Sequence, residues 1–184
     1  MLAVVVVVVV LAVLLAVMFV VSFNRLQRAR QAVREAWAQI DVMLARRYRL
    51  ITDLAAVTAG AAAFERTASE ALVAARDRAA NLGDAPEVRG RAEEQVDHEV
   101  HQVVARIEAL PELRAEPAFA RLRQELVAAE DDVSAARRYY NGRVRLYHTA
   151  RESFPAVLVA SSLGFRPAEY FQAEREEREV PNAR

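Results

Sequence analysis

Two histidines near the middle of the chain are the first candidates for chemistry. His98 and His101 are three residues apart, and Glu94 precedes His98 by four residues. On a helix this spacing brings two imidazoles and a carboxylate near one another, where they could bind a metal ion. A di-metal site in a helical bundle needs a Glu-x-x-His pair and a second such motif, and the sequence has neither. We therefore expect two solvated histidines and no metal, and keep a metal-binding protein acting through His98 and His101 as an alternative.

The sequence motifs of common enzyme classes do not occur. No Gly-x-Ser-x-Gly turn positions a serine for nucleophilic attack. The five Gly residues are scattered, so no glycine-rich loop is available to bind a phosphate. The acidic pairs Glu93–Glu94 and Asp131–Asp132 are adjacent and would diverge on a helix, which is typical of solvated faces. We therefore expect a non-enzymatic protein with no catalytic residues, no cofactor and no small-molecule substrate.

Composition narrows the classes of partner. The formal net charge is zero, so no overall field attracts nucleic acid, and we expect no nucleic-acid partner. All 25 Lys and Arg residues are Arg, and coding bias explains this better than a phosphate site does, although Arg suits phosphate well. The chain has no Cys, which excludes disulfides, thiolate ligands and lipid-modified cysteines.

Arg and Tyr side chains make up the candidate interaction surface. One group of Arg residues follows the apolar N-terminal segment, and a second group flanks Tyr139 and Tyr140. These two adjacent tyrosines cannot both face a core, so one hydroxyl is expected to be exposed. The surface would bind a protein partner or a second copy of the chain, or else be the polar side of a helix. Its members are Arg25, Arg28, Arg30, Arg34, Arg137, Arg138, Tyr139 and Arg143.

The segment from Met1 to Phe23 predicts a transmembrane helix. It contains no charged side chain and is rich in Val and Leu. A bilayer core of about 30 Å needs roughly 20 helical residues, which this segment supplies. A cleaved signal peptide is the alternative, although the segment lacks a basic start and an Ala-x-Ala motif; Val20 and Ser22 could satisfy a lax cleavage site. We favour an uncleaved single-pass anchor in the lipid bilayer.

Charge asymmetry predicts the orientation of this anchor. Apart from the amino terminus nothing basic precedes the span, whereas several Arg residues follow it, beginning at Arg25. The positive-inside rule then places the C-terminal domain in the cytoplasm. The same Arg side chains can reach anionic headgroups, so a lipid or membrane-state sensor is a second functional alternative.

The chain beyond the span is patterned as long helices. Apolar residues recur at spacings of three, four and seven from Leu26 to Leu54, and a weaker pattern continues to about Ala80. We expect one long helix over this region, although Gly60 favours a kink or break. Arg47 lies close to the apolar stripe, where its stem can pack while its charged end reaches solvent.

The sequence Asn81–Pro86 predicts that this helix stops and another starts. Gly83 is expected to adopt the left-handed conformation, and Asp84 with Glu87 fits a capping box. The second helix should run from about Ala85 to Ala109.

A third helix has the clearest pattern in the chain. Its apolar residues recur at every seventh position, which predicts a coiled-coil-like seam in a bundle. The phase continues across Asn141-Gly142, so we expect helix there rather than a hairpin turn. The residues of the seam are Phe119, Leu126, Val133, Tyr140, Tyr147 and Phe154.

Short elements are expected after the seam. Pro155 is predicted either to end the third helix or to start a short helix, Pro155–Leu163, closed by Gly164, and Glu174–Arg184 is predicted to be frayed or disordered. Three aromatic residues should pack back on the bundle, namely Phe165, Tyr170 and Phe171. The fold class predicted is all-α, with a transmembrane helix continuing into an antiparallel up-and-down bundle. The domains are an anchor (1–23), a bundle (24–172) and a charged tail (173–184).

The chain resembles the LemA family of bacterial membrane-anchored proteins. The resemblance rests on the Trp-x-Gln-Ile-Asp motif at Trp37–Asp41, the Ala-Arg-x-x-Tyr-Asn motif at Ala136–Asn141, and the sequence around them. It extends over nearly the whole chain, in the segments Phe23–Leu54, Phe119–Ala156 and Leu163–Phe171. The chain departs from the family pattern at Thr52 and Asp53, where Pro and Asn are usual, and at His148, where Asn is usual.

The resemblance implies a helical bundle on a single-pass anchor in the bacterial inner membrane, with no defined biochemical activity. We therefore expect a membrane-tethered scaffold or adaptor that binds protein partners or itself. The alternatives are an anionic-lipid sensor that uses the juxtamembrane Arg cluster and the metal protein through His98 and His101.

Overall fold

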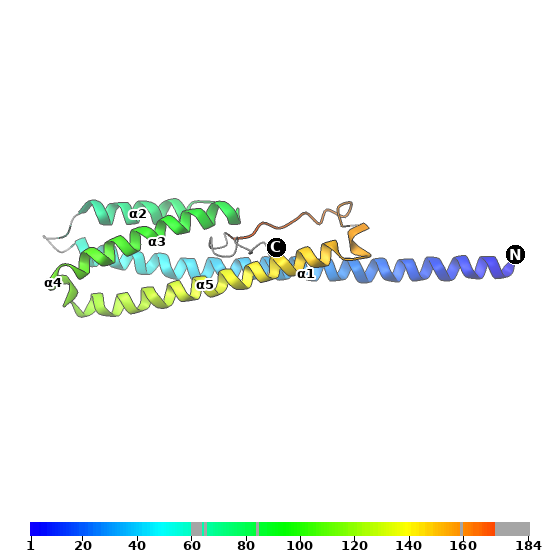
Figure 1. Cartoon of the computed structure of the whole chain (residues 1–184), viewed down its shortest axis with the longest axis horizontal. Helices are drawn as coiled ribbons and strands as arrows, with labels where there is room; N and C mark the ends of the chain where they lie inside the picture. Colours follow the sequence, from blue (N-terminus) through cyan, green and yellow to red (C-terminus); the bar gives the residue numbers. More distant parts are fainter. Residues whose placement is uncertain (60–63, 65, 84, 159, 172–184) are drawn as a thin grey trace, which may run out of the picture. The chain divides into compact units, whose positions relative to one another are not determined.

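The computed structural model describes residues 1–59, 64, 66–83, 85–158 and 160–171, and its regular elements are helices only (Figure 1). This confirms the all-α fold class. The helices, in chain order, are α1 (Leu2–Ala59), α2 (Arg66–Ala80), α3 (Pro86–Glu108), α4 (Pro111–Arg114), α5 (Pro117–Glu152) and the 3-10 helix η1 (Ala156–Leu158).

The chain divides into two compact units. Unit 1 combines Met1–Ala38 with Tyr139–Ala168, and unit 2 combines Gln39–Arg138 with the chain from Glu169 onward. Helices α1 and α5 each contribute to both units. The expected domain limits, with an anchor ending at residue 23 and a bundle ending at residue 172, stay predictions. The expected disordered tail, Glu174–Arg184, lies outside the described residues.

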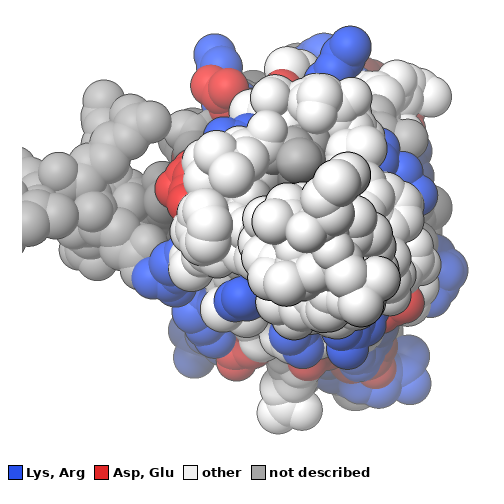
Figure 2. Space-filling model, turned by 90° about the vertical axis from the view of Figure 1, so that its right-hand side faces the viewer, with Lys and Arg blue, Asp and Glu red and all other residues white. Residues whose placement is uncertain are grey.

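The first part of α1 is apolar and exposed on every side. All side chains from Leu2 to Val17 are exposed, and none is charged. Figure 2 looks at this end of the chain and shows no charged side chain on the end of the helix nearest the viewer. Among the described residues, α1 is the one helix long and apolar enough to cross a membrane, as the sequence predicts.

Unit 1 is a pairing of α1 with the C-terminal part of α5. The rings of Trp37 and Tyr140 lie 5.4 Å apart, and those of Phe23 and Phe165 lie 5.7 Å apart in an edge-to-face arrangement. Contacts of this kind stabilise aromatic pairs beyond their buried area. The side chains buried in this unit include Leu26, Val33, Ala36, Val144, Tyr147 and Ala150.

Unit 2 holds one hydrophobic core built from all of its longer helices. Ile51 and Leu54 of α1 and Leu72 of α2 are fully buried, and Val96 and Ile107 of α3 join the same cluster. Helices α2 and α3 lie side by side along their length (Figure 1). The α5 residues in the cluster are Phe119, Leu122, Leu126 and Ala129, so the predicted seam of the third helix is confirmed here.

Two expectations about the first helix and its turn are wrong. The helix does not continue to Ala80, because α1 ends at Ala59 and a separate helix begins at Arg66. Gly83 does not have the positive φ expected of a left-handed helix end. Asp84, half of the expected capping box, lies outside the described residues, and Ala85 is the N-cap of α3, followed by Pro86 at the first helical position. Proline suits that position because its missing N–H would have no helical partner there.

The end of α5 departs from the seven-residue pattern. Asn141 and Gly142 are helical, as predicted, but α5 ends at Glu152 and leaves Phe154 72 % exposed. Proline restricts the residue before it to extended conformations, which explains why the helix stops short of Pro155. The expected short helix is only the 3-10 turn η1, although Gly164 does adopt a positive φ of 73°.

The three C-terminal aromatic residues do not all pack as expected. Phe165 is buried in unit 1 and Phe171 is buried in unit 2, each with only 2 % of its surface exposed. Tyr170 is 43 % exposed, so the expectation that all three are buried is wrong for this residue.

Candidate functional site

Three Arg side chains surround one hollow in unit 1. Arg30 and Arg34 of α1 and Arg166 of the C-terminal segment line a cavity of about 400 Å³. The other described residues that line it are Val33, Tyr147, Gly164, Pro167 and Ala168, so none of its described lining residues is acidic. Arg30 and Arg34 belong to the surface predicted from the sequence, whereas Arg166 was not predicted, because it lies far from them in the sequence.

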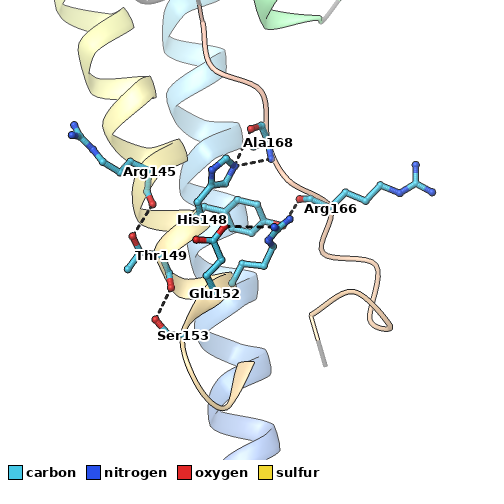
Figure 3. Close-up of polar contacts among 9 residues, drawn as sticks. Arg145, His148, Thr149, Glu152, Ser153, Arg166 and Ala168 are labelled. Atoms are coloured by element: carbon cyan, nitrogen blue, oxygen red, sulfur yellow. Dashed lines mark hydrogen bonds and ion pairs between the residues drawn. The ribbon is translucent and has the colours of Figure 1, made fainter. Parts of the chain in front are cut away.

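Side chains of α5 hold the backbone that carries Arg166 (Figure 3). The Tyr147 hydroxyl donates a hydrogen bond of 2.7 Å to the carbonyl oxygen of Arg166, and the backbone N–H of Ala168 donates one of 3.2 Å to Nε2 of His148. Burial raises the pKa of the Tyr147 hydroxyl above its ordinary value, so this group keeps its proton and its role as donor. The site is therefore positioned by two neighbouring residues of one helix.

The chemistry of this hollow is that of an anion site. Guanidinium groups present several N–H donors in a plane, which matches the oxygens of a phosphate or carboxylate. None of Arg30, Arg34 and Arg166 forms an ion pair with an acidic side chain among the described residues. Their positive charge is therefore not neutralised within the described part of the chain.

The other members of the predicted surface fall in two places. Arg25 and Arg28 are exposed on α1 in unit 1, while Arg137 and Arg138 belong to the unit 2 part of α5. The structure brings two of the predicted residues into contact: the Arg143 guanidinium lies 4.8 Å from the centre of the Tyr139 ring and donates a 2.7 Å hydrogen bond to its hydroxyl. Tyr139 is the exposed member of the tyrosine pair and Tyr140 is buried, as the sequence predicts.

Leu146 extends the face made by Tyr139 and Arg143. It follows them on α5 with helical spacing, so the three residues share one face of the helix. Its side chain is 58 % exposed. Leu146 is not among the predicted surface residues. The sequence did hold a signal for it, because this large apolar residue lies between the predicted seam positions Tyr140 and Tyr147 and not on the seam itself. The three residues form an exposed apolar and cationic surface, called here the Tyr139 face.

A buried ion cluster in unit 2 joins α1 to α3. The Arg47 side chain is 1 % exposed, and its guanidinium lies 3.5 Å from Oε2 of Glu93 and forms a second ion pair with Asp97. The Tyr48 hydroxyl donates a hydrogen bond to Oε1 of Glu93. The expectations that the Arg47 head reaches solvent and that Glu93 is solvated are both wrong, whereas Glu94 is exposed as expected.

Burial sets the electrostatics of this cluster. It raises the pKa of the Glu93 carboxyl above its ordinary value, against the lowering effects of the Tyr48 hydroxyl and the nearby Arg side chains. Burial and the adjacent Glu93 also raise the pKa of Tyr48. A third ion pair, 2.6 Å from Nη1 of Arg89 to Oδ1 of Asp41, connects the same two helices. Buried charges are stable only when paired, so these contacts fix how α1 and α3 are aligned.

The histidines do not gather a metal site in the structure. His98 and His101 are exposed on α3, as predicted. Nδ1 of His101 lies 2.7 Å from the carbonyl oxygen of Asp97, and Nε2 of His98 lies 3.2 Å from the Gln102 amide. Among the described residues, no group of three or more His, Asp or Glu side chains is arranged to hold a metal ion. The alternative of a metal protein therefore gains no support from the geometry.

A protein-family model matches most of the chain. The model of the LemA family matches residues 36–184, which include the Trp37–Asp41 and Ala136–Asn141 motifs but not the apolar segment of α1. No curated protein matches the chain.

We predict that Arg47→Met destabilises unit 2. The substitution removes the guanidinium that pairs with the buried Glu93, so the free energy of unfolding should fall by about 3 kcal/mol, the lower end for a broken buried pair because Arg89 stays nearby and Glu93 can take up a proton. Urea unfolding of the full chain in mild detergent, followed by circular dichroism, measures the change. The matched control is Arg46→Met, which breaks the exposed 2.8 Å pair with Asp132 and should change stability by about 0–1 kcal/mol. Equal effects of the two substitutions would contradict the role given to the buried pair.

Glu93 should also give stability a defined pH dependence. Because its folded-state pKa is raised, the folded chain binds its proton more tightly than the unfolded chain. The resulting contribution to stability is full below the ordinary pKa near 4.5 and is lost as pH rises through the raised folded value. Glu93→Gln cannot titrate and should remove this decline from a series of urea unfolding curves measured upward from pH 4.5. An unchanged pH slope in this variant would show that the Glu93 carboxyl is not protonated in the folded chain.

Proposed function

Since this chain belongs to the LemA family, which suggests a membrane-associated helical protein, we propose that it is a single-pass protein of the bacterial inner membrane. Its helical domain lies in the cytoplasm and acts as a non-enzymatic scaffold or adaptor. It works by contact with protein partners or with further copies of itself.

The environment of α1 is the observation that carries this proposal. From Leu2 to Val17 the helix exposes apolar side chains on every side, and after Phe23 the buried residues Leu26, Val33 and Ile40 make one apolar face. A fully apolar surface is unfavourable in water and favourable in a bilayer. The Arg residues that begin at Arg25 support a cytoplasmic position for the rest of the chain.

The Tyr139 face supports a role in binding. Tyr and Arg are enriched among residues that contribute most to protein–protein affinity, and here Arg143 is held on the Tyr139 ring before any partner binds. Leu146 adds exposed apolar area beside them. A preorganised face of this kind loses less conformational entropy on binding.

The anion hollow favours a second candidate function, the sensing of anionic lipid. Arg30, Arg34 and Arg166 lie in the unit that contains the proposed span, and no described residue that lines their hollow is acidic. The ligand would be the phosphate of an anionic headgroup at the membrane surface. Binding could then report lipid composition to the helical domain.

We predict that a partner contacts the Tyr139 face in native membranes. A photo-crosslinking residue at Leu146 should give a discrete adduct with one protein or with a second copy of the chain. The same residue at Val42, which is 63 % exposed on α1, is the control and should give little adduct. Tyr139→Ala should weaken the Leu146 adduct because the anchor of the face is removed. No protein adduct at Leu146, or equal adducts at both positions, would count against the scaffold.

We predict that the anion hollow binds an anionic phospholipid. The full chain in zwitterionic detergent should bind short-chain phosphatidylglycerol, measured by calorimetry, more tightly than short-chain phosphatidylcholine. Each Arg near an anionic surface contributes about 1 kcal/mol, so replacing Arg30, Arg34 and Arg166 together by Gln should weaken binding by roughly a hundredfold. Arg49→Gln, at an exposed Arg of unit 2, is the control and should have no effect. Binding that is insensitive to the triple change, or to added salt, would exclude the sensor.

A further inference from the structure

An exposed apolar patch follows α5 in unit 1. From Ser153 to Phe165 the sequence has no charged residue, and within this stretch Phe154, Val157 and Leu158 are 72 %, 47 % and 69 % exposed. These three residues are called the apolar patch. Phe154 lies on the turn that follows α5, and Val157 and Leu158 lie on η1, so all three belong to one short stretch of the chain. Large apolar side chains gathered on a surface mark a site that another apolar phase or molecule covers.

Ring contacts in unit 1 show how far along α1 this patch lies. Trp37 contacts Tyr140, and from this contact α1 and α5 run toward the same end of the unit, where Phe23 contacts Phe165. Phe23 precedes Trp37 by the same number of residues by which Phe154 follows Tyr140. At 1.5 Å per helical residue both lie roughly 20 Å from the Trp37–Tyr140 contact. The patch is therefore level with Phe23, where the uncharged segment of α1 ends.

The burial of α1 agrees with this placement. All side chains from Leu2 to Val17 are exposed, but Met18 is half-buried and Ser22 is buried. The Ser22 hydroxyl donates a 2.7 Å hydrogen bond to the carbonyl oxygen of Met18, so it needs no water. The rest of unit 1 thus covers one side of α1 as far as the last turns of the uncharged segment.

We propose that the apolar patch inserts into the interfacial layer of the bilayer beside α1, as a second membrane contact of this chain. The inference rests on the proposed membrane span and adds to it. The bilayer is the occupant that the structure favours, because the patch is level with the end of the span and Phe165, at the end of the same uncharged stretch, contacts Phe23 of α1. Apolar side chains at the boundary between headgroups and acyl chains gain the free energy of leaving water.

Charged residues frame the patch in the way that this position requires. The uncharged stretch follows Arg151 and Glu152, whose side chains form a 3.6 Å ion pair, and it precedes Arg166; on α1 the first charged residue after the span is Arg25. Guanidinium groups at this depth meet lipid phosphates while the residues between them meet acyl chains. The patch and the span together hold unit 1 to the membrane at two points, so the α1–α5 pair has a fixed rotational orientation about the axis of the span.

Spin labelling of the full chain in nanodiscs tests this inference. The chain has no native Cys, so Leu158→Cys, Leu146→Cys and Val8→Cys each provide one labelled site. Leu146 is the matched control, since it is 58 % exposed on α5 and lies roughly 12 Å farther from the end of the span. Val8, in the span, reports whether the chain crosses the bilayer at all. Each label is measured for contact with oxygen, which concentrates in lipid, and with a water-soluble nickel chelate.

The expected result is a lipid signature at Val8 and Leu158 and an aqueous signature at Leu146, with Phe154→Cys repeating the result for Leu158. An aqueous signature at Leu158 with a lipid signature at Val8 would overturn the second contact and leave the anchor intact. Protection of Leu158 from both reagents would overturn it in favour of a protein contact at the patch. An aqueous signature at Val8 would overturn the span, and the second contact with it. Circular dichroism of each variant confirms that the helices are retained, since the replaced side chains are exposed.

Discussion

The apolar surface of α1 from Leu2 to Val17 is the constraint on which the rest of the structure depends. Within the described part of the chain these side chains are all exposed, and free energy favours their transfer out of water. Once this segment lies in lipid, each later feature has a defined depth. Phe23 marks the end of the uncharged stretch, and Arg25 and Arg28 come at the headgroups. From there on, the same helix buries only one face. Along this one helix the apolar surface thus changes from one that covers every side to one that forms a single stripe. We interpret this as a change of surroundings from lipid to water.

A different interaction specifies unit 2. Its core is rich in Ala, Val and Leu, which pack in many alignments with similar energy. The pairs between Arg47 and Glu93 and between Arg89 and Asp41 are more selective, because a sliding of α1 against α3 by one turn would leave buried charges unpaired. The Tyr48 hydroxyl binds Glu93 in the same alignment. We interpret this cluster as a device that fixes the alignment of two helices, and place binding on the exposed Arg and Tyr residues of unit 1.

Regular spacing of apolar residues predicted the helices well. The stripe from Leu26 to Leu54 and the seam from Phe119 to Tyr147 are buried as expected, since each can be recognised within one segment. What failed depends on contacts between segments. Arg47 and Glu93 lie on different helices, so neither helix alone indicates that its charge is paired and buried. Arg166 joins Arg30 only because Tyr147 and His148 hold its backbone. The exposure of Phe154 is a different kind of failure, because its signal lay in the same segment. Pro155 indicates that the helix, and the seam with it, should end before this residue.

The contact between Trp37 and Tyr140 gives the molecule a built-in optical probe. Trp37 is the single tryptophan of the chain, and it lies in unit 1 where α1 meets α5. Its emission wavelength depends on how far its ring is shielded from water, and α5 provides that shielding. Intrinsic tryptophan fluorescence therefore follows the separation of these two helices in an unmodified chain, without interference from a second tryptophan. Any ligand, lipid or partner that loosens the pair would shift the emission to longer wavelengths.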